Sequence, residues 1–166
     1  MVLKWGVKED DMRIKTLVPG TLIASLCSVL GMASGFAGEK QKYQFMVFSN
    51  AESGKEESYL KWYEGQHIHD LLRIPGFVAA QFFRLSDTQY AGTQPQRYLM
   101  IWEIETDDLP SVFADVKARL KDGRTVFTDA FVGGFSTTMS PITKRVTAEE
   151  ITGKSVDEVE AIAKGK

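Results

Sequence analysis

Two titratable side chains, His67 and Asp70, lie three residues apart within residues 60–77 (LKWYEGQHIHDLLRIPGF), which read as a helix that Pro75-Gly76 ends. An imidazole has an unperturbed pKa of about 6.5, so His67 can accept or donate a proton close to neutral pH. A carboxylate one turn away can orient that ring or hold it in one tautomer. Tyr63 precedes His67 by one turn on the same face, where its hydroxyl can donate to a substrate carbonyl. These three residues are the candidate catalytic groups.

Each of the three also has a structural interpretation. His67 can be a core histidine that bonds to a backbone carbonyl or to Asp70 and ties the helix down. Asp70 can cap the loop before Pro75 through backbone amides. Tyr63 can simply be packed in the core, as most buried tyrosines are.

The helix period decides which residues share a face with His67. The apolar stripe consists of Leu60, Tyr63, His67, Leu71 and Ile74. Trp62 and His69 are expected on the opposite face, with Trp62 packed against a loop or a partner subunit. Because residues two apart diverge on a helix, His67 and His69 are not expected to chelate one ion, and no metal site is predicted.

Three residues on predicted strands are candidates for substrate binding. Arg84 can reach a carboxylate on a substrate, although a surface salt bridge is the other interpretation. Trp102 and Phe45 are expected in the core, where they can line an apolar pocket.

Composition narrows the class of protein. The 166 residues are 43% apolar and 25% charged, which is typical of one globular domain. The formal net charge is −2, and no basic cluster with interleaved aromatic residues occurs, so nucleic acid is not expected as a partner. Cys27 is the only cysteine, which excludes an intramolecular disulfide. The common phosphate, dinucleotide and zinc-protease motifs are absent, and no cofactor is predicted.

Residues 1–37 are interpreted as a secretory signal peptide or an N-terminal extension. Arg13 and Lys15 precede an uncharged run from Thr16 to Ala37, and small residues near its end fit cleavage after Ala37. The protein is therefore expected to be periplasmic or secreted. A retained membrane anchor is the alternative, and a membrane is a partner only in that case.

The remaining chain alternates strands and helices. Strands are predicted at residues 42–50, 77–85, 97–105 and 135–146, with a packed loop at 124–134. The first helix contains His67, and the second begins near Asp107 or Asp108 and ends at Gly123. A C-terminal tail, residues 147–166, holds a short helix that begins at Ser155 with a capping box.

The order β-α-β-β-α-β predicts an α+β fold of the ferredoxin-like kind, with an antiparallel sheet, over residues 42–146. Both helices are expected on one face of the sheet. The other face is then apolar, and a second copy of the chain can bury it, so a homodimer is predicted.

A motif in the first helix points to a family. The stretch 62–77 reads W-Y-x-x-x-H-x-x-D-x-x-x-x-P-G-F. With the preceding strand it resembles the EthD-like branch of the dimeric α+β barrel superfamily, over residues 43–142. The resemblance implies a dimer whose two sheets form a barrel, with a small-molecule pocket between helix and sheet in each protomer. His69 departs from the pattern, because similar sequences often have proline there.

The resemblance leaves three functions open, since related barrels include isomerases, polyketide cyclases, dehydratases, monooxygenases and haem-degrading enzymes. The first hypothesis is a small cofactor-independent enzyme, an isomerase, cyclase, dehydratase or other lyase, that acts by proton transfer on an aromatic or polyketide-like molecule. In it His67 moves the proton, Asp70 positions His67 and Tyr63 assists. The second is an exported, non-catalytic protein that binds a small molecule. The third is a monooxygenase or haem-handling protein of the same fold.

Overall fold

A computed structural model describes residues 38–166, and the predicted signal segment 1–37 lies outside the described residues. In chain order the elements are β1 (Gln41–Ala51), α1 (Glu56–Lys61), η1 (Trp62–His67), α2 (Ile68–Leu72), β2 (Phe77–Arg84), β3 (Tyr98–Thr106), α3 (Leu109–Asp122), β4 (Phe131–Met139), α4 (Ala148–Ile151) and α5 (Val156–Ala163). The elements α1, η1 and α2 follow one another without a break and form the helix predicted around His67. No helix between residues 38 and 166 has the length and apolar character that a membrane crossing requires.

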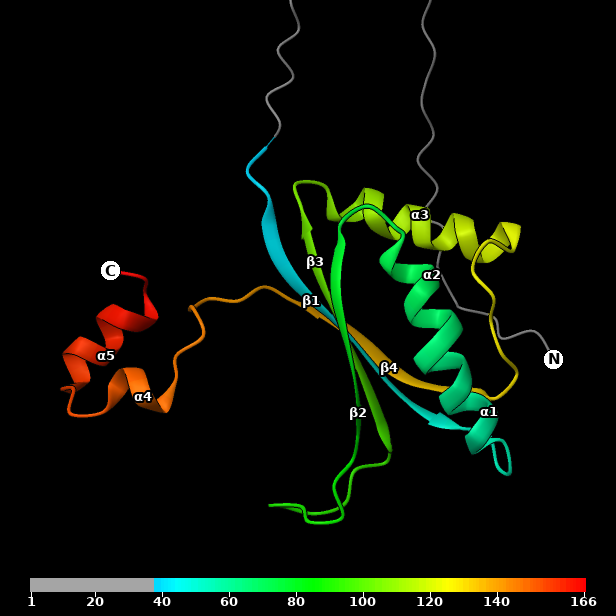
Figure 1. The fold of residues 1–166 in the computed structure, drawn as a ribbon, viewed down its shortest axis with the longest axis horizontal. Helices are drawn as coiled ribbons and strands as arrows, with labels where there is room; N and C mark the ends of the chain where they lie inside the picture. The colour runs from blue at the N-terminus through cyan, green and yellow to red at the C-terminus, as the bar shows by residue number, and fades with distance from the viewer. Residues whose placement is uncertain (1–37) are drawn as a thin grey trace, which may run out of the picture. The chain divides into compact units, whose positions relative to one another are not determined.

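The four strands form one antiparallel sheet in the order β2-β3-β1-β4. The helices α1, α2 and α3 lie on one face of that sheet (Figure 1), and side chains from both layers make one buried cluster. This element order and this strand order are those of the ferredoxin-like fold, so the predicted α+β class is confirmed.

Strand register decides which side chains reach the helices. In β3 the alternation is clear, because Tyr98, Met100, Trp102 and Ile104 are buried while the residues between them are partly exposed. Phe45 of β1 is the direct cross-strand partner of Trp102, so it faces the same helices.

The fourth strand differs from its prediction. It begins at Phe131 rather than at Phe135, and it ends at Met139, shortly before a proline that cannot donate to a sheet. Gly133 and Gly134, at the end of the predicted loop 124–134, lie inside the strand instead. A Cβ on Gly134 would be 2.6 Å from Cγ of Gln96, so this glycine lets the Gln96 side chain pack closely against the strand.

The face of the sheet turned away from the helices is apolar and partly exposed. We call it the open face, and its apolar side chains are Met46, Phe48, Phe83, Leu99, Ile101, Phe135 and Met139. Phe48 and Phe135 stack across the strand pair with ring centroids 4.3 Å apart, although Phe135 is 54% exposed. A contiguous exposed apolar surface of this kind is typical of a protein interface.

The C-terminal tail contains two short helices, each begun by a capping box. The box predicted at Ser155 and Glu158 is confirmed, and Thr147 with Glu150 forms a second at a helix that the sequence pattern did not indicate. Among the described residues, the side-chain hydrogen bonds and ion pairs made by residues 144–166 stay within that segment.

Gly76, which joins α2 to β2, provides a test of this packing. Its φ of +102° is left-handed, and a Cβ on it would lie 2.9 Å from Cγ2 of Val112. We expect Gly76→Ala to lower the free energy of unfolding by about 1–3 kcal/mol, because it adds both backbone strain and a clash.

Gly65→Ala is the matched control for Gly76→Ala. Its added Cβ meets no atom within 4 Å, and alanine favours a helix over glycine by about 0.5–1 kcal/mol. Denaturant unfolding of both variants measures the contrast, and equal stabilities would contradict the packing described for Gly76.

Candidate functional site

One turn of the helix is wound as a π-helix, and this turn sets the surroundings of His67. The N–H of Ile68 donates to the carbonyl of Tyr63, five residues earlier. In a π-turn, residues five apart come together, whereas in an α-helix the neighbours are three or four apart. Trp62 therefore stacks on His67, with ring centroids 4.2 Å apart and planes at 23°. The prediction that Trp62 points away from His67 is wrong, because it assumed a regular α-helix.

Three aromatic rings enclose the imidazole of His67. Besides the stacked Trp62, Tyr63 meets it edge-on at 5.2 Å and Trp102 meets it edge-on at 5.5 Å. His67 is 9% exposed, as its place in the apolar stripe predicts. We call Trp62, Tyr63 and Trp102 the aromatic enclosure. Two candidate catalytic residues, His67 and Tyr63, are thus brought together with one candidate substrate-binding residue, Trp102.

The ring of His67 has a buried nitrogen without a partner. Nδ1 receives no hydrogen bond from residues 38–166. Burial lowers the pKa of His67 to about 4, and the charge of Asp70 opposes this effect only in part. The imidazole is therefore neutral at pH 7, with one nitrogen able to donate and the other able to accept. An unpartnered buried polar atom costs about 1–3 kcal/mol, so such an atom indicates a functional role or a bound molecule.

Asp70 is buried but makes no hydrogen bond to His67. Its carboxylate accepts from Nε2 of Gln66 at 2.7 Å and from the N–H of Val126 at 3.1 Å. Burial alone would raise the pKa of Asp70, but hydrogen bonds from Gln66, Val126 and His69 lower it below its ordinary value. Asp70 thus holds a loop through a backbone amide, as its structural interpretation proposes. The loop is the one that follows α3, however, and not the expected loop before Pro75.

Tyr63 is packed and also keeps its proton. Its ring is buried and stacks on Phe82 at 4.5 Å. Burial raises the pKa of Tyr63 to about 12, against the opposing effect of the Ser49 hydroxyl. The hydroxyl therefore remains a hydrogen-bond donor at neutral pH, which is the state that a carbonyl-polarising role requires.

The other two candidate substrate-binding residues lie outside the aromatic enclosure. Phe45 neighbours Trp102 across the strand pair, but its ring meets Phe113 of α3 edge-on at 5.2 Å. Arg84 is exposed at the end of β2, opposite Tyr98 and four residues along β3 from Trp102. The structure therefore does not bring Arg84 beside His67.

Residues that the sequence did not point to come from the 123–130 segment, between α3 and β4. The carbonyl of Val126 accepts from Nε1 of Trp62 at 2.8 Å, and its N–H donates to Asp70. Phe127 meets Trp62 edge-on at 5.4 Å. The expected loop contact of Trp62 is thus present, but nothing in the sequence identifies Val126 as its partner. The one visible sign of an irregular turn is Gly65, a glycine in a helix interior.

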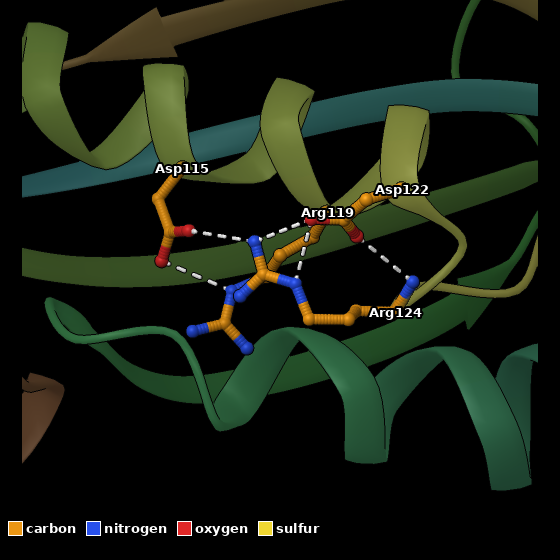
Figure 2. A network of polar contacts seen from close by, with 4 residues as sticks. All are labelled: Asp115, Arg119, Asp122 and Arg124. Atoms are coloured by element: carbon orange, nitrogen blue, oxygen red, sulfur yellow. Dashed lines mark hydrogen bonds and ion pairs between the residues drawn. The ribbon is translucent and has the colours of Figure 1, made fainter.

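An ionic network fixes the start of the 123–130 segment (Figure 2). Asp115 contacts Arg119 at 3.0 Å and Arg124 at 3.9 Å, and Arg124 also contacts Asp122 at 2.7 Å. Gly123 ends α3 in the left-handed conformation within this network. Exposed ion pairs each contribute about 0–1 kcal/mol, so the network orients the segment more than it stabilises the fold.

Two surface hollows lie away from His67. One, of about 470 Å³, lies where β3 meets α3, and the other, of about 460 Å³, lies on the exposed side of α1 and η1. Neither hollow is lined by His67 or Trp102. Within the described chain, no group of three or more His, Cys, Asp or Glu residues is placed to hold a metal ion. Three aromatic rings surround His67, and the 123–130 segment contacts Trp62 and Asp70 beside it.

Comparisons with known proteins give matches among solved structures only. No protein-family model and no curated protein matches the chain. A structure described as "a putative monooxygenase", from Shewanella loihica PV-4, is similar over 66% of this chain and 98% of its own, with 15% identity and a TM-score of 0.43. An ethyl tert-butyl ether D (EthD) family protein from Bacillus halodurans C-125 is similar over 60% of this chain and 97% of its own, with 16% identity and a TM-score of 0.40.

The lowered pKa of His67 makes the stability of the fold depend on pH. Below its ordinary pKa of 6.5 the unfolded chain binds a proton at this histidine, whereas folded His67 stays neutral down to about pH 4. As the pH is lowered from 6.5 to 4, we expect the free energy of unfolding to fall by roughly 3 kcal/mol because of His67. Above pH 6.5, His67 should not contribute to the pH dependence of this free energy.

His67→Phe should abolish this loss, because phenylalanine fills the aromatic enclosure without a titratable group. His69→Gln, at the exposed neighbouring histidine, should leave the loss in place. Denaturant unfolding at several pH values measures it, and an unchanged pH dependence in His67→Phe would show that His67 is not buried in its neutral form.

Proposed function

We propose that this chain binds an uncharged small molecule at His67. The observation that carries the proposal is the buried Nδ1, which no described residue contacts by a hydrogen bond. A ligand hydroxyl or carbonyl supplies the missing partner, and the aromatic enclosure supplies apolar contact to a flat ring. This is the second of the hypotheses from the sequence, and it also forms the binding step of the first.

The surroundings of His67 favour an uncharged ligand over an anionic one. The imidazole is neutral at pH 7. Arg84, the cation that can reach a substrate carboxylate, lies on β2 opposite Tyr98, four residues along β3 from Trp102. Burial of an unpaired carboxylate among aromatic rings is costly. Phenols and lactones are therefore better candidates than aromatic acids, whose carboxylate would need Arg84 as its partner.

A proton-transfer reaction is the second candidate function, and the state of Tyr63 supports it. The Tyr63 hydroxyl keeps its proton at neutral pH and lies on a ring in contact with His67, so it suits polarising a carbonyl. The imidazolium form of His67 is disfavoured by burial, so His67 serves best by donating and accepting protons in one concerted transfer. Isomerisation, cyclisation and dehydration are reactions of this type. The site then belongs to a cofactor-independent isomerase or lyase.

We also propose that two copies of the chain pair through the open face and that the protein is exported. The apolar side chains of the open face are partly exposed in one chain, and burying them favours association. The signal-like segment 1–37 supports a periplasmic or secreted location.

Phenol is the probe for the His67 site. We expect phenol to shift the ring signals of His67 and not those of His69 in the NMR spectrum, which is simple to assign because the chain has two histidines. Benzoate, which is charged at pH 7, should bind at least about tenfold more weakly.

The matched variants separate this site from the surface. His67→Phe should weaken phenol binding by about tenfold, because it removes the hydrogen-bonding nitrogen but keeps an aromatic ring. His69→Gln should leave the affinity unchanged. Equal affinity in His67→Phe and the wild type would refute the proposed site.

Phe135→Glu tests the proposed dimer. A charge at Phe135, on the open face of edge strand β4, should convert dimers to monomers in analytical ultracentrifugation, because its burial against a second copy lacks a partner. Tyr90→Glu is the control, since Tyr90 is fully exposed in a loop outside the sheet. A Phe135→Glu protein that remains dimeric would place the interface elsewhere.

A further inference from the structure

Two buried side-chain polar atoms lack a partner within residues 38–166, one in the helix and one in the 123–130 segment that bonds to the helix. They are Nδ1 of His67 and the hydroxyl of Thr125. Thr125 directly precedes Val126, and Val126 accepts the hydrogen bond of the indole that stacks on His67. Buried imidazole and hydroxyl groups nearly always have partners, so two exceptions beside one loop need a common explanation.

We infer that the 123–130 segment is a movable cover over His67, and that Thr125 and His67 together bind the polar atom of an uncharged ring compound beneath it. The inference rests on the proposed function. It adds to that function a second ligand-binding residue and a route of entry. The closed conformation has both polar groups in place and the entrance shut.

The contacts that hold the middle of the 123–130 segment are few and largely at the surface. Val126 makes two main-chain hydrogen bonds, one to Trp62 and one to Asp70. Phe127 meets Trp62 edge-on, and the exposed Asp129 pairs with Lys55 at 2.6 Å. The outer side chains of Val126 and Phe127 are each more than half exposed, so little apolar contact opposes opening on that side. Segments with few buried contacts open locally at small free-energy cost.

Both ends of the segment are anchored. At its start, the N–H of Thr125 donates to the carbonyl of Arg119 at 3.1 Å, beside the ionic network of Figure 2. At its end, Ala130 is buried, and its carbonyl accepts from the N–H of Glu52 at 2.8 Å. A segment fixed at both ends and weakly held in the middle suits a cover that opens and recloses in place.

The two unpartnered groups match one hydroxyl or carbonyl of a ligand. A neutral imidazole nitrogen accepts from a ligand O–H, and the Thr125 hydroxyl donates to the same oxygen. If Nδ1 instead carries the ring proton, a ligand carbonyl accepts from both groups. In each case the ligand satisfies two buried groups with one polar atom. A phenol or a lactone has the required atom on a ring that fits among aromatic side chains.

The first experiment compares Thr125→Val with Thr106→Val in the full chain, because Thr106 is also buried but lies at the end of β3, outside the 123–130 segment. Thr125→Val should weaken phenol binding about threefold to tenfold without lowering thermal stability, because the buried hydroxyl it removes has no hydrogen-bond partner within residues 38–166. Thr106→Val should do the opposite. The Thr106 hydroxyl accepts from the N–H of Asp108, so its loss should lower stability and leave phenol affinity unchanged.

The second experiment measures hydrogen exchange at the amide of Val126. Phenol at ten times its Kd should slow this exchange about tenfold, because a ligand held under the closed cover disfavours opening. Trp62→Phe, which removes the indole N–H but keeps an aromatic ring, should speed it. The amide of Met100, in the buried strand β3, provides the reference for global unfolding.

The outcomes separate the inference from the proposed function. If phenol perturbs His67 but Thr125→Val binds it with unchanged affinity, or if phenol leaves Val126 exchange unaltered, the cover is refuted and the His67 site stands. If neither phenol nor δ-valerolactone perturbs His67 in the wild-type chain, the site is refuted and the cover with it. Weaker binding in Thr125→Val together with slowed Val126 exchange establishes the inference.

Discussion

The stacking of Trp62 on His67 is the interaction on which the rest of the site depends. It exists because η1 brings residues five apart onto one side of the helix. The stacked indole directs its N–H to Val126, and this places the 123–130 segment against the helix. A regular α-helix would separate the two rings, and the loop after α3 would then lack its principal contact with the helix. The π-helical winding of η1 thereby determines how the 123–130 segment, far along the sequence, packs against the helix.

The site is less favourable to folding than a fully apolar equivalent. Nδ1 of His67 and the Thr125 hydroxyl are buried without a hydrogen-bond partner among the described residues. Each such group costs about 1–3 kcal/mol, whereas the surrounding aromatic residues contribute burial and ring contacts that offset it. Buried polar groups without partners concentrate at functional sites, because elsewhere no function retains them against their cost in stability.

Much of the fold follows from patterns in the sequence, while the site follows only in part. Strand alternation in β3, Pro75-Gly76 after the helix and the capping box at Ser155 are local signals, and local signals survive in the structure. The burial of His67 also follows from its helical period. The contact of Trp62 does not, because periodicity arguments assume an α-helix. The partner of Asp70 is a backbone amide fifty-six positions away, and a backbone group leaves no mark in a sequence.

Recognition of Val126 through its main chain has a consequence for how this protein can vary. Every residue except proline offers the same N–H and carbonyl, so the attachment of the loop does not depend on which side chain occupies position 126. The side chain itself is directed outward and is half exposed. Mutation can therefore alter the outer rim of the site, its size and its polarity, while the frame beneath remains intact. Substitutions at position 126 can therefore change ligand preference during evolution with little effect on the stability of the fold.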